Sequence, residues 1–205
     1  MKFVGHLDMM RYFQKAIRRA NVDIAYSEGY SPHQIMSFAS PLGVGITSEC
    51  EYLDIELNSY EEPDKLLEAL NNVMVDEVEI LEFRYLEDKS KNAMSIVSAA
   101  DYLITFRKGF ELKVVDLESS INTFYEQSHI TTLKKTKKSE KEVDIKSMIY
   151  EIYTLNDGIF MKLSAGSVSN LKPELVMNAF YQYLGLEMPK FAVEIKRLEV
   201  YLDEE

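Results

Sequence analysis

The turn Asn156-Asp157-Gly158 restricts the folds open to this chain more than any other segment. It lies between two apolar segments, MIYEIYTL and GIFMKLSA, and such a turn between strand patterns predicts a β-hairpin. Before the hairpin, ADYLITFRK is typical of a strand, and Asp116 can cap a helix that ends near Gln127. After it, Pro173 opens a helix through Leu184, and FAVEIKRLEVYL predicts a long final strand.

The second half therefore contains strand, helix, strand, a hairpin strand, helix and strand, which fits the ferredoxin-like split βαβ plan. HITTLKK supplies the strand after the first helix, and the polar residues 134–142 predict an exposed loop. We predict an α+β fold of two tandem ferredoxin-like lobes with antiparallel sheets, residues 1–90 and 91–205. The polar stretch 87–92 marks the boundary.

The first half shows the same plan in reduced form. Apolar residues spaced by three and four predict an amphipathic helix over 7–20, and the alternation of Leu53, Ile55 and Leu57 predicts a strand. Pro63 opens a second helix, and EVEILEFRY predicts a closing strand. If the plan holds, this lobe lacks its N-terminal strand, and the native start would lie upstream of Met1.

Composition favours a cytoplasmic protein. Cys50 is the one cysteine, so an intrachain disulfide is excluded and a reducing compartment is the simplest interpretation. No apolar run approaches the roughly 18 residues that cross a bilayer, and the N-terminus lacks the apolar stretch of a signal peptide. We therefore expect neither membrane insertion nor secretion.

The net charge of −11 is unevenly distributed. Residues 1–48 carry five Lys and Arg against three Asp and Glu, whereas residues 49–91 carry four against fourteen. Nucleic-acid binding is driven by cations that displace phosphate counterions. Because the acid lies in the middle of the chain, a local basic face is compatible with an acidic protein.

Residues 5–57, which begin GHLDMMRYFQKAIRRANVDIAYSEGYSPHQIMSF, resemble the radical-SAM-linked family of uncharacterised bacterial proteins, a domain of unknown function. The later segments KKTKKSEKEVDI and AGSVSNLKPE also resemble that family. The resemblance implies a partner, because the family's domain is encoded beside, or fused to, a cobalamin-binding type of radical S-adenosylmethionine (SAM) protein. The family usually has asparagine where Ser31 stands, and proline with a basic residue where Gln34 and Ile35 stand.

Radical chemistry needs three thiolates around an iron–sulfur cluster, so Cys50 alone cannot support it and the partner must supply it. We interpret Cys50 as a small packing residue. No GxGxxG or P-loop pattern exists, which leaves the chain without a standard dinucleotide or nucleoside triphosphate motif. We therefore expect no cofactor.

Two histidines are candidates for acid–base catalysis. His6 and Asp8 open the first predicted helix near Arg11, and His33 lies in a loop that could approach His6. The competing interpretation is a first-turn carboxylate paired with an arginine three residues on. No spacing pattern supports a metal site.

Glycine-bearing loops are candidate anion sites, since glycine lets a ligand approach the backbone. The segment GSVSN, before a predicted helix, can bind an anion on its amides or cap the helix. The loop candidates are Gly29, Gly43, Gly45, Gly166 and Asn170.

Basic and aromatic residues suggest contact with RNA. Phosphate contact and base stacking use this combination, although a lysine run is also typical of a solvated loop. The candidates are Arg11, Lys15, Arg18, Arg19, Tyr30, Lys134, Lys135, Lys137 and Lys138, with Lys141 in the same run.

Three hypotheses follow. The first is a non-catalytic accessory protein of a radical SAM enzyme that binds RNA or an RNA-linked substrate. The second is a metal-independent endoribonuclease with His6 or His33 as acid or base. The third is a scaffold whose acidic residues 49–91 dock a basic partner.

Overall fold

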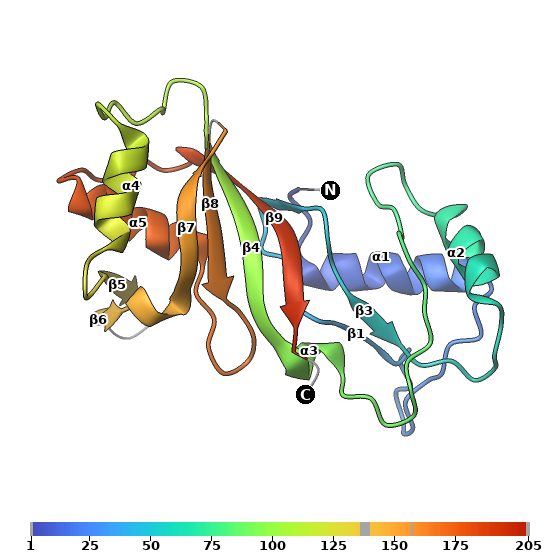
Figure 1. Ribbon diagram of the computed structural model, residues 1–205. Coiled ribbons are helices and arrows are strands. Elements are labelled where there is room, and N and C mark those ends of the chain that lie inside the picture. The colour runs from blue at the N-terminus through green and yellow to red at the C-terminus, as the bar shows by residue number, and fades with distance from the viewer. Residues whose placement is uncertain (1, 136–139, 157, 204–205) are drawn as a thin grey trace. The chain divides into compact units, whose positions relative to one another are not determined.

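The computed structural model describes residues 2–135, 140–156 and 158–203 (Figure 1). The chain forms two compact units. Unit 1 comprises residues 1–45 and 52–95, and unit 2 comprises 46–51 and 96–205. The expected division at residue 90 kept 46–51 in the first lobe, whereas this segment packs in unit 2 because it pairs with a C-terminal strand.

Unit 2 is built on a five-stranded sheet with the strand order β2-β9-β4-β8-β7. Four strands pair antiparallel, and β2 pairs parallel to β9. The strands are β2 (Ile46–Ser48), β4 (Val97–Phe106), β7 (Ile149–Leu155), β8 (Gly158–Ser164) and β9 (Val193–Leu202).

Two helices join these strands in the order of a split βαβ unit. They are α4 (Leu117–Tyr125), between β4 and β7, and α5 (Pro173–Tyr183), between β8 and β9. Figure 1 shows both on one face of the sheet. The four antiparallel strands have the order β9-β4-β8-β7, as in a split βαβ unit. The segment HITTLKK, expected to supply the strand after the first helix, lies instead in a separate two-stranded sheet. The predicted hairpin and the Asp116 cap are confirmed, the Asp116 carboxylate accepting from Ser119 N at 3.1 Å.

The core of unit 2 lies between the helices and the sheet. Alternation along β8 turns Ile159, Met161 and Leu163 toward the helices, where all three are fully buried. The rings of Phe124 on α4 and Phe180 on α5 meet edge to face at 5.3 Å above them. These two rings therefore fix α4 against α5 over the sheet.

A second, two-stranded sheet consists of β5 (Thr131–Lys135) and β6 (Glu140–Asp144), and the short 3₁₀ helix η1 (Lys146–Met148) follows it. The predicted exposed loop over 134–142 is wrong at both ends. The buried residues Ile130, Thr132 and Ile145 anchor this hairpin to the unit, and the ladder then continues into the charged residues.

Unit 1 packs two helices against a two-stranded sheet. Its elements are α1 (His6–Arg19), β1 (Met36–Phe38), β3 (Leu53–Ile55), α2 (Pro63–Asn71) and the short α3 (Ala93–Ile96) at the boundary with unit 2. The core collects Ile17 from α1 and Leu66 and Leu70 from α2. Single antiparallel bridges, Ile24 with Leu57 and Tyr26 with Gln34, extend the pairing beyond β1 and β3.

The α+β class is confirmed, but the tandem arrangement is not seen in the described part of unit 1. The expected closing strand EVEILEFRY is not a strand in the structure and pairs with no neighbouring strand among the described residues. Instead, the side chain of Asn71 accepts from Ile80 N at 2.8 Å and donates to Ile80 O at 2.9 Å. A side chain therefore satisfies the backbone that a neighbouring strand would otherwise pair.

Helices in the described part of the chain are short, and α1 has 14 residues. None of them combines the length and apolar character needed to cross a membrane.

Candidate nucleic-acid interface

The solvent face of α1 is basic. Residues spaced by three and four share one face of a helix, and here the buried positions are Ala16 and Ile17. The exposed positions are Leu7, Asp8, Arg11, Lys15, Arg18 and Arg19. Four cations and a single carboxylate therefore line one side of this helix, and we call Arg11, Lys15, Arg18 and Arg19 the cation stripe.

Local contacts hold three members of the cation stripe without burying them. Arg11 Nη1 lies 3.1 Å from Asp8 Oδ1, with about two-thirds of each side chain exposed (69% and 67%). Arg18 Nε donates to Gln14 O at 3.2 Å, and Arg19 Nη2 donates to Val73 O at 2.9 Å. An exposed pair such as Asp8–Arg11 contributes about 0–1 kcal/mol, so the stripe remains open to an anionic ligand.

The turn that follows α1 presents an aromatic ring to solvent. Ser27 N donates to His33 O at 2.8 Å, and Ser27 Oγ lies 2.8 Å from His33 Nδ1. Gly29 within the turn has φ +109°, a left-handed conformation that favours glycine. Tyr30 at the tip is fully exposed, so its ring is available for stacking on a base.

The histidines nominated by the sequence have separate local environments. His6 meets Phe38 edge to face at 5.9 Å, and His33 is bonded to Ser27. No hydrogen bond or ring contact between the two histidines occurs in the described residues, and Asp8 pairs with Arg11 as the competing interpretation expected. Nor do these residues contain a group of three His, Cys, Asp or Glu side chains suited to a metal ion.

The glycine loops have structural roles, which sequence alone could not distinguish from a role in ligand binding. Gly43 is exposed, and Gly45 donates its N–H to Lys2 O at 2.8 Å. Gly166 has φ +120°, and a Cβ there would lie 2.2 Å from Val97 O. Close packing against β4 therefore accounts for this glycine. Asn170 is exposed, and α5 has no side-chain cap at its N-terminus.

The lysine run lies on the β5–β6 hairpin. Lys134 and Lys135 end β5, Lys141 is exposed on β6, and Lys134 and Lys141 are cross-strand partners. Lys137 and Lys138 lie outside the described residues. The run belongs to unit 2, and the cation stripe belongs to unit 1.

Sequence reasoning missed a histidine–carboxylate pair at the base of this hairpin. His129 Nδ1 lies 2.6 Å from Asp144 Oδ2, and the His129 side chain is 76% exposed. This hydrogen bond, followed by one from Lys146 N, lowers the pKa of Asp144 below its ordinary value. The two residues are far apart in sequence, and only the hairpin register, which pairs Thr131 with Asp144, brings them together.

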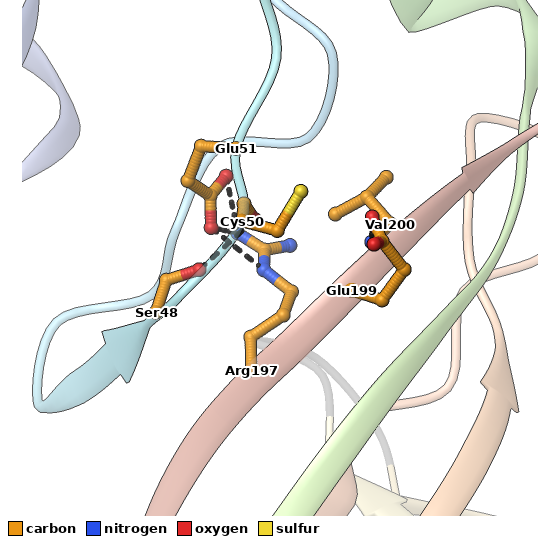
Figure 2. A network of polar contacts seen from close by, with 6 residues as sticks. All are labelled: Ser48, Cys50, Glu51, Arg197, Glu199 and Val200. Carbon is orange, nitrogen blue, oxygen red and sulfur yellow. Dashed lines mark hydrogen bonds and ion pairs between the residues drawn. The ribbon is translucent and has the colours of Figure 1, made fainter. Parts of the chain in front are cut away.

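An ion pair between a buried arginine and a partly exposed glutamate joins the 46–51 segment to β9 (Figure 2). Arg197 donates from Nε and Nη2 to the two carboxylate oxygens of Glu51, at 2.9 and 3.0 Å, and its side chain is 3% exposed. Burial raises the pKa of Glu51, and Arg197 opposes this shift. Cys50 is half-buried beside this pair, and its carbonyl accepts from Ser48 Oγ at 3.0 Å.

The family described as an uncharacterised protein conserved in bacteria (DUF2344) has a model that matches residues 1–173. The chain belongs to this family. The match to DUF2344 includes the cation stripe and the whole β5–β6 hairpin, and it ends at the first residue of α5.

A distant structural likeness comes from the solved structures. No curated protein matches the chain in sequence. A chain in the crystal structure of a Cbf5-Nop10-Gar1 complex is similar, with 10% sequence identity and a TM-score of 0.47. The similarity covers 96% of the DUF2344 chain but 46% of that chain, so the protein spans less than half of the length of this neighbour.

Proposed function

We propose that this DUF2344 protein is an accessory protein of a radical SAM enzyme that binds RNA or an RNA-linked substrate. The observation that carries the RNA part is the exposed cation stripe on α1 in a chain of net charge −11. Phosphate is the ligand that an exposed row of Lys and Arg side chains recognises in nucleic acids.

The fully exposed Tyr30 supports the same proposal, since single-stranded RNA is bound by combining phosphate contacts with base stacking. Both features belong to unit 1. The partnership with a radical SAM enzyme, one with a cobalamin-binding-type domain, is supported by the resemblance of residues 5–57 to the radical-SAM-linked family. The single cysteine supports an accessory role in that chemistry.

RNA binding is tested by a salt titration of the triple variant Arg11→Gln, Lys15→Gln, Arg18→Gln. We expect the plot of log affinity against log salt to lose about 2 from its slope, because each lost single-strand phosphate contact removes roughly 0.7. Fluorescence anisotropy with a short labelled single-stranded RNA measures this. The Asp8–Arg11 pair is exposed, so the fold should tolerate the change.

The matched control is Lys108→Gln, Lys113→Gln, Lys172→Gln, which removes the same charge from exposed positions of unit 2. This control should leave the slope close to that of the wild type. If the slope falls equally in both variants, net charge alone explains the effect. If the wild-type protein binds no RNA, the proposal is wrong. Co-purification with a radical SAM protein that carries a cobalamin-binding-type domain tests the partnership separately.

A further inference from the structure

The imidazole of His129 is oriented by a carboxylate. Its Nδ1 lies 2.6 Å from Asp144 Oδ2, and an ionised carboxylate only accepts hydrogen bonds. Nδ1 therefore carries a hydrogen atom and donates a hydrogen bond to Asp144. This arrangement leaves the lone pair of Nε2 free to accept a proton from a substrate.

Asp144 is itself held in place. Its Oδ1 accepts from Ile130 N at 3.1 Å and from Lys146 N at 3.0 Å. Ile130 and Ile145, each 2% exposed, anchor the chain on both sides of the pair. The carboxylate is thus fixed by backbone N–H groups just before β5 and just after β6, and it fixes the ring in turn.

The site is open and has a cation nearby. The side chain of His129 is 76% exposed and that of Asp144 is 41% exposed, so a polymer can reach the ring. The ammonium of Lys146, two residues after Asp144, lies over the Tyr125 ring at 3.4 Å and donates to Tyr125 O.

We propose that His129 is the general base of an RNA-cleaving activity, with Asp144 as its positioning residue. The inference goes beyond an accessory role and rests on the RNA-binding part of the proposed function. RNA is the substrate that suits the site, because a ribose supplies its own nucleophile beside each phosphate.

The reaction is an internal transesterification. Nε2 of His129 takes the proton from a 2′-hydroxyl, and the 2′-oxygen attacks the adjacent phosphorus. The bond from phosphorus to the 5′-oxygen breaks, and the leaving 5′-oxygen takes a proton from water. The imidazolium returns its proton to solvent, so the products are a 2′,3′-cyclic phosphate and a 5′-hydroxyl. No redox step or added nucleophile is needed.

The experiment follows cleavage of a short labelled single-stranded RNA by the full-length protein, with an all-deoxy strand as the control substrate. We expect the RNA to be cut to a 2′,3′-cyclic phosphate and the DNA to stay intact, because only RNA has the 2′-hydroxyl. His129→Ala should slow cleavage by about a hundredfold or more while the affinity for RNA, read by anisotropy, is unchanged.

Asp144→Asn tests the positioning role. The amide retains an oxygen for the two backbone donors, but its NH₂ group cannot accept from Nδ1, which favours the wrong tautomer of His129. We expect kcat to fall about tenfold or more with KM unchanged. If Asp144 only stabilised the fold, its replacement would change kcat and KM together. Ser128→Ala and Glu126→Gln, exposed neighbours on the same segment, should cleave at the wild-type rate.

The outcomes separate the two proposals. If the wild-type protein binds RNA but does not cut it, or if His129→Ala cuts it equally fast, the general-base assignment is overturned and RNA binding stands. If the protein binds no RNA, the proposed function is lost and the cleavage proposal is lost with it.

Discussion

Replacing Gly166 by alanine is expected to lower the free energy of unfolding by about 3–4 kcal/mol. Gly166 has φ +120°, a conformation that L side chains rarely adopt. An added Cβ would lie 2.2 Å from Val97 O and 3.2 Å from Val97 C, both atoms of the backbone. Backbone at the start of β4 cannot rotate away as a flexible side chain would, so the strain and the steric clash add.

Gly109→Ala is the matched control in the same unit. Gly109 also has positive φ, +88°, but a Cβ there meets nothing within 4 Å, so we expect only the backbone cost of about 1–2 kcal/mol. Urea denaturation followed by circular dichroism measures both. Equal losses in the two variants would show that the β4 backbone shifts freely, and the packing explanation of Gly166 would be wrong.

Replacing Arg197 by methionine is expected to cost about 2–3 kcal/mol at neutral pH. The change removes the bidentate partner that now donates at 2.9 and 3.0 Å to Glu51, whose side chain is 26% exposed. The loss is destabilising because water replaces these charge-assisted hydrogen bonds only in part. The 46–51 segment should therefore come away from β9 more readily, and proteolysis there should be faster.

The loss of stability in Arg197→Met should also grow as the pH rises. Burial raises the folded-state pKa of Glu51 even in the wild-type protein, and loss of Arg197 raises it further. The folded state then binds more protons than the unfolded state, so stability falls as the pH rises through the interval between the two pKa values. Urea midpoints should show the variant closest to the wild type on the acidic side of this interval.

The double variant Glu51→Gln, Arg197→Met is the control for this prediction. It removes both charges at similar side-chain size, so it should recover most of the lost stability and lose the added pH dependence. A double variant as unstable as Arg197→Met alone would mean that packing by Arg197, and not its charge, holds the segment.

Local signals in the sequence located most elements of unit 2. Alternation located β9, the Asn156-Asp157-Gly158 turn located the β7–β8 hairpin, and Asp116 marked the start of α4. These three predictions succeed because each pattern depends either on contacts within a few residues or on one continuous buried face. The basic face of α1 was predictable for the same reason, since helical spacing alone places its cations on one side.

Unit 1 shows where local patterns are insufficient. EVEILEFRY has strand character, but a strand also needs a neighbour, and Asn71 occupies the hydrogen-bonding groups of Ile80 instead. Residues 134–142 have loop composition, yet the buried residues at the hairpin base extend a ladder into them. In both cases tertiary packing outweighed intrinsic propensity.

The sequence by itself determined the α+β class, the order of the elements of unit 2, the basic side of α1 and the single cysteine. The tertiary structure alone decided that 46–51 pairs with β9, that Glu51 meets Arg197, and that His129 meets Asp144. The physical reason is register. Each of these pairs joins residues far apart in the chain, and their meeting depends on which strands pair and at which offset, a choice made by burial across the whole unit.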